Sequence, residues 1–295
     1  MGSESFLLTS PDKVGIPAFR REKNKEQNKN DSDPIFYFNL SDILTAVKGE
    51  LLVKGSGNSF SGVSIDSRAI KSGEIFIAIS GNRFDGHNFV AEAIAKGAGC
   101  VIVSKPKAIL TGDQLSAGVI LVEDTLSALS SLAYWHRKRF AIPVLCVTGS
   151  NGKTTTKEML DRLLSSRYKM LKNEGTQNNI IGLSLTLLKL RKEHEAAVLE
   201  LGTNHFGELK ELARIAAPNV GIITNIGPAH LESFGDEKGV LREKWSLIEE
   251  LAFPRIAILN ADDDLLQEKI LSPGDVTVFT FGIKNKADWM AKKTA

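Results

Sequence analysis

The sequence predicts an α/β protein in which a small α/β domain precedes a larger domain with a mainly parallel sheet flanked by helices. From residue 143 onward, near-continuous apolar strands alternate with helices, which is typical of a parallel sheet covered on both faces. A glycine-rich turn joins the first of those strands to a helix. A shorter α/β region comes before it, and 295 residues are enough for two domains.

The composition is that of an ordinary soluble globular protein, with 42% hydrophobic and 24% charged residues. A net charge of +2 indicates neither a nucleic-acid-binding nor a membrane-binding surface. No apolar run approaches the roughly 18 residues of a membrane helix, and the N-terminus lacks a signal peptide's apolar core. Cys100 and Cys146 lie in apolar segments and are interpreted as reduced core thiols. We expect a cytoplasmic protein, and we also expect a monomer.

Residues 1–34 are predicted to be a disordered tail. Residues 20–33 contain no apolar side chain, so they cannot bury enough surface to offset the entropy cost of ordering. The small domain is assigned to residues 35–124, where Ser41 is a suitable N-cap for a helix at 42–47. Its other elements are expected to be strands at 62–66, 74–80, 100–103 and 118–123 and a helix at 88–98.

The larger domain is assigned to residues 125–295, and a helical segment at 124–140 leads into it. The expected strands are 143–148, 196–201, 220–226, 255–261 and 276–281. The expected helices include 155–166, 179–192, 207–216 and 237–252.

Polar residues lie at or just beyond the ends of four of these strands. They are Gly149–Thr154, then Glu200, then Asn225 and His230, and finally Asn260, Asp262 and Asp263. Ligands bind beyond the carboxyl ends of the strands in such sheets. The sequence therefore predicts a ligand site along this edge.

The turn after the first strand, in VLCVTGSNGKTTTKEML, resembles a phosphate-binding loop, although Gly149 and Gly152 are closer together than in the usual motif. Glycines let backbone N–H groups approach phosphate, and the helix N-terminus adds positive potential. Lys153 can reach the outer phosphates and Thr154 can ligate Mg²⁺. The following helix is predicted to have an apolar face made of Met159, Leu160, Leu163 and Leu164.

Three further residues are ambiguous when each is considered alone. Glu200 ends an apolar strand, where either bound Mg²⁺ or a salt bridge would explain a carboxylate. His230 is compatible with a metal ligand or with a loop hydrogen bond. Lys244 cannot bind metal as an ammonium, and spacing alone gives it no role.

Together these motifs resemble the ATP-dependent Mur ligases of peptidoglycan synthesis. The matching segments are TGSNGKTTTKE, LELGTNHFGEL, TNIGPAHLESFG, REKWSLIEEL and LNADDD, and that family uses the shortened loop. The front segment SIDSRAIKSGEIFIAISGNRFDGHNFVAEAIAKGA resembles the family's uridine-nucleotide-binding domain. The resemblance covers about residues 36–285. It implies a UDP-substrate domain followed by a P-loop-type central domain.

The implied activity is the joining of D-alanyl-D-alanine to UDP-N-acetylmuramoyl-tripeptide through an acyl phosphate, which gives UDP-MurNAc-pentapeptide, ADP and phosphate. ELGTNHFGEL and TQNNIIGLSLTLL favour this member of the family over the one that adds the third peptide residue. That second ligase remains an alternative, as does a non-catalytic UDP-sugar-binding module. A generic P-loop kinase would leave the front domain unexplained.

The resemblance also implies roles for individual residues. The ATP-binding set is Gly149, Ser150, Asn151, Gly152, Lys153, Thr154, Thr155 and, on the adenine side, Asn260. The catalytic set is Lys153, Glu200, His230 and Lys244, and the Mg²⁺ ligands would be Thr154, Glu200, His230 and Lys244, the last as a carbamate formed with CO₂. The UDP-sugar would lie near Ser67, Arg68, Asp85, Gly86 and His87, and the muramyl peptide near Thr176, Gln177, Asn178 and Asn179.

Mur ligases carry a third, C-terminal domain that closes over ATP and helps to bind the incoming amino acid or dipeptide. Because the chain stops at Ala295, we expect that domain to be absent and the central one to be truncated. Lid closure commonly completes a catalytic site. We therefore expect this chain alone to bind nucleotide weakly and to ligate poorly or not at all.

Overall fold

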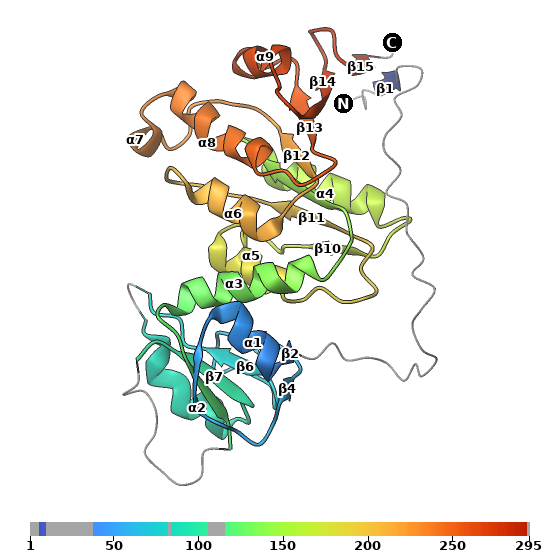
Figure 1. Cartoon of the computed structure of the whole chain (residues 1–295). Helices are drawn as coiled ribbons and strands as arrows, with labels where there is room; N and C mark the ends of the chain where they lie inside the picture. The colour runs from blue at the N-terminus through green and yellow to red at the C-terminus, as the bar shows by residue number, and fades with distance from the viewer. Residues whose placement is uncertain (1–5, 10–37, 82–83, 106–115, 294–295) are drawn as a thin grey trace, which may run out of the picture. The chain divides into compact units, whose positions relative to one another are not determined.

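The computed structural model describes residues 6–9, 38–81, 84–105 and 116–293 and divides into two compact units (Figure 1). The first unit is Asn24–Phe140 with Ser184–Arg191, and the second is Met1–Lys23, Ala141–Leu183 and Lys192–Ala295. The chain passes from one unit to the other after Phe140, so the helix that precedes this point belongs with the first unit. No helix in the described part of the chain is long and apolar enough to cross a membrane.

The first unit is built on a sheet of five strands within the described residues, in the order β3-β8-β7-β6-β5. Only β3 runs antiparallel to its neighbour. These strands are β3 (Glu50–Val53), β5 (Val63–Ser64), β6 (Ile75–Ile77), β7 (Cys100–Val103) and β8 (Gly118–Leu121). The short strands β2 (Phe38–Asn39) and β4 (Ser59–Phe60) pair with each other.

The helices of the first unit are α1 (Leu40–Val47), the 3₁₀ turn η1 (Gly86–Phe89), α2 (Val90–Ala95) and α3 (Thr125–Lys138). The prediction that Ser41 caps α1 was wrong. Asn39 occupies the N-cap position with extended backbone, and its side chain makes no capping hydrogen bond to the helix. The reason is that Asn39 ends β2 and the chain turns directly into the helix, which places Ser41 inside the first turn.

The second unit confirms the predicted parallel sheet. In the described residues its strand order is β1-β15-β14-β13-β12-β9-β11-β10, and only β1 is antiparallel. The strands are β9 (Val144–Thr148), β10 (Met170–Lys172), β11 (Ala196–Glu200), β12 (Val220–Ile223), β13 (Ile256–Asn260), β14 (Thr277–Gly282), β15 (Trp289–Lys293) and β1 (Phe6–Thr9). The four strands predicted to carry polar residues at their ends, β13, β12, β9 and β11, are consecutive neighbours.

The helices that begin in this part of the chain are α4 (Lys153–Leu164), α5 (Ile180–Leu187), α6 (Glu208–Ala216), α7 (Leu231–Phe234), α8 (Glu237–Glu249) and α9 (Asp264–Leu271). Helices α6 and α8 contact each other and both contact β9 (Figure 1). Crossovers between parallel strands are right-handed, and the chain reverses its direction across the sheet at β10. Helix α4 therefore lies on the opposite face from α6 and α8.

Helix α4 corrects one prediction about burial. Met159 and Leu163 are 61% and 69% exposed, whereas Leu160 and Leu164 are partly buried. Lys157 is the buried residue of this helix. The face toward the sheet contains positions 157, 160 and 164, at the spacing of three and four residues that defines one side of a helix. Met159 and Leu163 each precede a residue of that face by one position in the sequence, and they therefore lie on another side of the helix.

Four residues of the predicted disordered tail depart from the prediction. Phe6–Thr9 forms β1, which pairs antiparallel with β15. This run, FLLT, is rich in residues that favour strands, unlike the polar segment at 20–33. The rest of residues 1–34 lies outside the described ranges.

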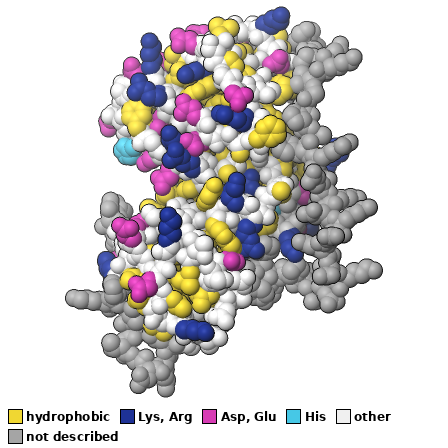
Figure 2. Space-filling model, in the orientation of Figure 1, with side chains coloured by type: hydrophobic (Ala, Val, Ile, Leu, Met, Phe, Trp, Pro, Cys, Tyr) yellow, Lys and Arg dark blue, Asp and Glu magenta, His cyan; other side chains and the backbone are white. Residues whose placement is uncertain are grey.

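The visible surface carries charges of both signs. Figure 2 shows Lys and Arg side chains interspersed with Asp and Glu side chains over this face. The pattern agrees with the net charge of +2.

Candidate functional site

The loop between β9 and α4 has two glycines with positive φ. Gly149 has a φ of 149°, and a Cβ there would lie 1.9 Å from Thr224 Oγ1. Gly152 has a φ of 79° and begins α4 without any side-chain cap. The first N–H groups of α4 have no partners within the helix and are available to an anionic ligand.

The loop after β12 holds the glycine-rich loop in place. The Ser150 N–H donates to Asn225 O at 3.0 Å, and the Asn151 N–H donates to Asn225 Oδ1 at 2.9 Å. Thr224 Oγ1 donates to Asn151 O at 2.6 Å. Ser150 Oγ donates to Gly227 O and accepts from the Gly227 N–H, both at 2.9 Å. The protein therefore shapes this loop with its own hydrogen bonds.

Lys153 lies over the same loop. Its Nζ donates to Gly149 O at 2.9 Å and to Ser150 O at 3.3 Å. Thr154 and Thr155 are exposed on the first turn of α4. A cation and free N–H groups therefore occupy one helix N-terminus, which is the arrangement that binds phosphate.

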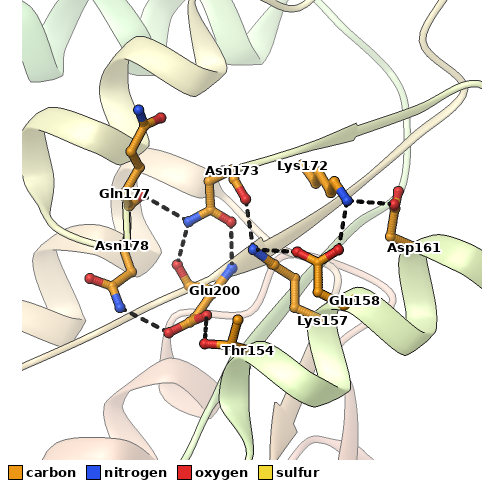
Figure 3. A network of polar contacts seen from close by, with 9 residues as sticks. All are labelled: Thr154, Lys157, Glu158, Asp161, Lys172, Asn173, Gln177, Asn178 and Glu200. Atoms are coloured by element: carbon orange, nitrogen blue, oxygen red, sulfur yellow. Dashed lines mark hydrogen bonds and ion pairs between the residues drawn. The ribbon is translucent and has the colours of Figure 1, made fainter. Parts of the chain in front are cut away.

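Glu200 faces α4 from the end of the neighbouring strand β11. The residue is 2% exposed, and its carboxylate accepts from Thr154 Oγ1 at 2.7 Å and from Asn178 Nδ2 at 2.9 Å (Figure 3). Within the described residues Glu200 forms no ion pair. A buried carboxylate with only neutral donors is costly, and a cation would stabilise it. The paired carboxylate and hydroxyl oxygens also suit Mg²⁺.

Lys244 and His230 lie in different environments. Lys244 is 3% exposed, and its ammonium makes no hydrogen bond or ion pair in the described part of the chain. Burial, and then the charge of Lys153, lowers the pKa of Lys244 to about 8. His230 is exposed with a φ of 52°, and its ring lies 6.3 Å from that of Phe234.

The structure therefore brings together only part of the predicted magnesium set. Thr154 and Glu200 are in direct contact. His230 and Lys244 make no direct contact with this pair among the hydrogen bonds of the described residues. No group of three or more His, Cys, Asp or Glu side chains there is placed to hold a metal.

The polar residues at the end of β13 and just after it form hydrogen bonds with neighbouring backbone groups. Asn260 Nδ2 donates to Thr224 O at 3.0 Å, and Asn260 Oδ1 accepts from the Asp262 N–H at 2.9 Å. Asp263 Oδ2 accepts from the Ile226 N–H at 2.6 Å, and Asp263 Oδ1 caps α9. These contacts tie the end of β13 to the end of β12.

Asp85 and His87, in the first unit, form one hydrogen-bonded cluster. His87 Nδ1 donates to Asp85 Oδ1 at 2.6 Å, while the Ser104 N–H donates to His87 Nε2 at 2.9 Å, so the ring proton is on Nδ1. Hydrogen bonds from Lys105 and then from His87 hold the pKa of Asp85 well below its usual range. A Cβ on Gly86 would lie 2.7 Å from a backbone nitrogen.

Ser67 and Arg68 make other contacts. Ser67 Oγ donates to Glu92 Oε2 at 3.0 Å. Arg68 pairs with Asp66 at 2.8 Å, with an 82% exposed side chain. No hydrogen bond among the described residues joins this pair to the Asp85 cluster.

The segment assigned to the muramyl peptide divides into inward and outward residues. Thr176 and Gln177 are exposed, and Asn179 Oδ1 accepts from the Gly182 N–H at 2.9 Å. Asn178 turns its amide to Glu200. Its side chain is therefore part of the Glu200 environment.

Comparison with known families shows which protein family the chain belongs to. Residues 147–295 match the Mur ligase middle domain, and residues 59–134 match the domain described as Mur ligase family, catalytic domain. The first match alone covers half of the chain. The chain belongs to the Mur ligase family.

The similar Mur ligases include both protein sequences and solved structures. The UDP-N-acetylmuramoyl-tripeptide–D-alanyl-D-alanine ligase of Synechocystis sp. is 37% identical over 244 residues, which are 83% of this chain and 48% of that protein. A crystal structure of MurF from Acinetobacter baumannii has a TM-score of 0.77 at 36% identity, covering 83% of this chain and 53% of that one. MurF from Thermotoga maritima in complex with ADP has a TM-score of 0.69 at 33% identity, covering 76% and 51%. The chain thus spans about half the length of these relatives.

Sequence reasoning missed two residues of this Mur ligase site. Asn173 follows β10 and Lys157 lies within α4, and both are fully buried beside Glu200. The available signals were weak: an asparagine after a short strand, and a lysine on the side of α4 that includes Leu160 and Leu164. Neither pattern indicates which backbone group the side chain forms a hydrogen bond with.

Proposed function

We propose that this chain supplies the ATP-binding and UDP-substrate-binding parts of a ligase that joins D-alanyl-D-alanine to UDP-N-acetylmuramoyl-tripeptide. The contact between Thr154 and the buried Glu200, beside a glycine-rich loop, carries the proposal. The similarity to the Synechocystis ligase supports the choice of substrates. The ADP-bound relative from Thermotoga maritima supports the choice of nucleotide.

The ATP phosphates would lie against residues 149–155. The N–H groups at the start of α4 would receive phosphate oxygens. Lys153 would exchange its bonds to Gly149 O and Ser150 O for bonds to the outer phosphate oxygens. Asn260 is assigned to the adenine side of the nucleotide.

Thr154, Glu200 and His230 would hold Mg²⁺, with Lys244 as a carbamate. When bound, the ion would neutralise charge that develops on the transferred phosphoryl group. Only the neutral amine of Lys244 reacts with CO₂, forming an N–C bond and releasing a proton. A pKa of about 8 supports this step, because it raises the neutral fraction near neutral pH.

The reaction would proceed by two transfers. A carboxylate oxygen of the tripeptide attacks the γ-phosphorus of ATP, the bond to ADP breaks, and an acyl phosphate forms. Lys153 stabilises the charge on the outer oxygens during this step. The amine of D-alanyl-D-alanine then adds to the acyl carbon, phosphate leaves, and the amine's proton is released. ATP is required because a carboxylate is a poor electrophile and phosphate is a good leaving group.

The UDP-sugar is assigned to the first unit, near Ser67, Arg68 and residues 85–87. The Asp85–His87 cluster offers a fixed set of polar groups there. The muramyl peptide is assigned to residues 176–179, of which Thr176 and Gln177 are exposed.

The first test measures nucleotide binding by calorimetry on the whole chain. We expect ADP to bind more tightly with Mg²⁺ than without it. We expect Lys153→Met to weaken ADP binding both with and without Mg²⁺, because the substitution removes the cation over the loop. UDP binding serves as the control, since Lys153 lies in the other unit. Binding of UDP without any binding of ADP would favour a non-catalytic UDP-sugar module.

The substrate is tested by turnover after the chain is joined to the remaining part of a UDP-N-acetylmuramoyl-tripeptide–D-alanyl-D-alanine ligase, because the chain spans about half the length of such relatives. We expect ADP release to require UDP-MurNAc-tripeptide and D-alanyl-D-alanine, and to rise with added bicarbonate. Release with UDP-MurNAc-dipeptide and a single amino acid would instead identify a ligase for the third peptide residue.

A further inference from the structure

A single buried asparagine holds the backbone on both sides of the Glu200 side chain. Asn173 Oδ1 accepts from the Glu200 N–H at 2.9 Å, and Asn173 Nδ2 donates to Glu200 O at 2.9 Å (Figure 3). The same Nδ2 donates to Gln177 O at 2.8 Å, next to Asn178. Because both peptide groups of Glu200 are fixed, the direction of its Cα–Cβ bond is fixed as well.

Lys157 connects this asparagine to the loop helix. Its Nζ donates to Asn173 O at 2.8 Å and pairs with Glu158 at 3.0 Å, and its side chain is 0% exposed. A fully buried ammonium is costly unless it is paired and hydrogen-bonded. Lys157 lies about one turn after Lys153 and Thr154 on α4, so the bridge joins the helix bearing Thr154 to the strand end bearing Glu200.

We propose that Asn173 and Lys157 are positioning residues that aim the Glu200 carboxylate at Thr154 and thereby set how much Mg²⁺ strengthens nucleotide binding. This inference rests on the proposed function, in which Thr154 and Glu200 hold the ion.

The bridge has a role that the direct contact cannot fill. The 2.7 Å hydrogen bond between Thr154 and Glu200 joins only the tips of two side chains, and those tips are the atoms that would bind the ion. The Asn173–Lys157 bridge uses none of those atoms. It keeps the two elements in register whether or not the tips are engaged. Such outer-shell hydrogen bonds orient metal ligands and tune metal affinity.

The test compares the affinity for ADP with and without Mg²⁺ on the full chain. Asn173→Ala removes all three hydrogen bonds of the Asn173 side chain, which join it to Glu200 and Gln177. Its matched control is Asn219→Ala, since Asn219 likewise accepts from a backbone N–H, that of Val144, and donates to a backbone carbonyl, that of Phe253. Asn219 precedes β12 and so lies at the opposite end of the sheet.

We expect Asn173→Ala to reduce the Mg²⁺-dependent gain in affinity by about 10-fold or more, and to leave the affinity without Mg²⁺ near that of the unchanged chain. Asn219→Ala should keep the full gain, although both substitutions lower stability. Amide exchange at Glu200 should also become faster in Asn173→Ala alone. An unchanged gain in Asn173→Ala would overturn the positioning role.

A second pair of variants covers the case in which Asn173→Ala does not fold. Lys157→Met keeps the length of the side chain and removes the donor to Asn173 O. Lys172→Met is its control, because the Lys172 ammonium pairs with Glu158 and Asp161 and, within the described residues, donates no hydrogen bond to Asn173, its neighbour in the chain. We expect only Lys157→Met to lose Mg²⁺ dependence, and equal effects of the two would overturn the proposal.

The unchanged chain separates this inference from the proposed function. If it binds ADP without any gain from Mg²⁺, the assignment of Thr154 and Glu200 to the ion fails, and the positioning role fails with it. If it shows the gain and the variants retain it, only the positioning role is overturned.

Discussion

At the scale of single residues, the two loop glycines make a matched pair. Gly149→Ala would place a Cβ 1.9 Å from Thr224 Oγ1 at a φ of 149°, so backbone or Thr224 must move. We expect a loss of roughly 2 kcal/mol or more in the free energy of unfolding, and loss of ADP binding, because the loop is held by residues 224–227. Chemical denaturation and calorimetry measure the two effects.

Gly152→Ala is the control for that substitution. Its φ of 79° disfavours alanine, but no atom lies within 4 Å of the added Cβ. A cost of about 1 kcal/mol is expected from the backbone alone. Equal costs at the two positions would show that the contact with Thr224 is relieved by a small shift.

The residues that sequence could identify are those whose role is local. The glycines, Lys153 and Thr154 are adjacent in the chain and share one turn, so their pattern is readable. The buried position of Glu200 followed from its place at the end of an apolar strand. The roles of Asn173 and Lys157 depend on contacts with residues 27 and 16 positions away, which no local pattern encodes.

At the scale of elements, helix α3 contains a buried histidine that should make the stability of the first unit depend on pH. His136 is 0% exposed, and its Nε2 lies 3.1 Å from Leu190 O in the segment that belongs to the same unit. Burial lowers the pKa of His136 from 6.5 to about 4. Between pH 6.5 and 4 the unfolded chain therefore binds more protons at this residue than the folded chain.

The first unit should consequently lose stability as pH falls through this window, by about 3 kcal/mol from His136 alone, with no further loss below pH 4. His136→Gln keeps a hydrogen-bonding amide and cannot titrate. We expect its unfolding free energy to fall less steeply between pH 6.5 and 4, as measured by urea titration. Parallel slopes in the two proteins would show that His136 binds protons equally in the folded and the unfolded chain, which would contradict the prediction.

The elements themselves were predictable where burial is continuous. Strands β9, β11, β12, β13 and β14 all lie in apolar runs and were predicted within a few residues. Strand β10 has three residues, MLK, and was missed because so short a run shows no periodicity. Strand β1 was missed because its pairing with β15 joins opposite ends of the chain, and propensity does not reveal such partners.

At the scale of the whole molecule, each unit contains a buried apolar cluster of its own. The core of the first unit includes Phe76, Val101 and Val119, and that of the second includes Val147, Val198 and Ile222. All residues assigned to ATP lie in the second unit, and all those assigned to the UDP-sugar lie in the first. We therefore predict two calorimetric unfolding transitions that respond to different ligands.

Two of the variants above identify the transitions. His136→Gln should change the pH dependence of the first unit's transition only, and Gly149→Ala should lower the temperature of the second unit's transition only. ADP with Mg²⁺ at about 100 times its dissociation constant stabilises its unit by about 2.7 kcal/mol, and UDP does the same for the other. Each ligand should thus raise one melting temperature and leave the other in place. A single transition that rises with either ligand would mean that the units unfold together, because binding energy supplied to one unit would then stabilise both.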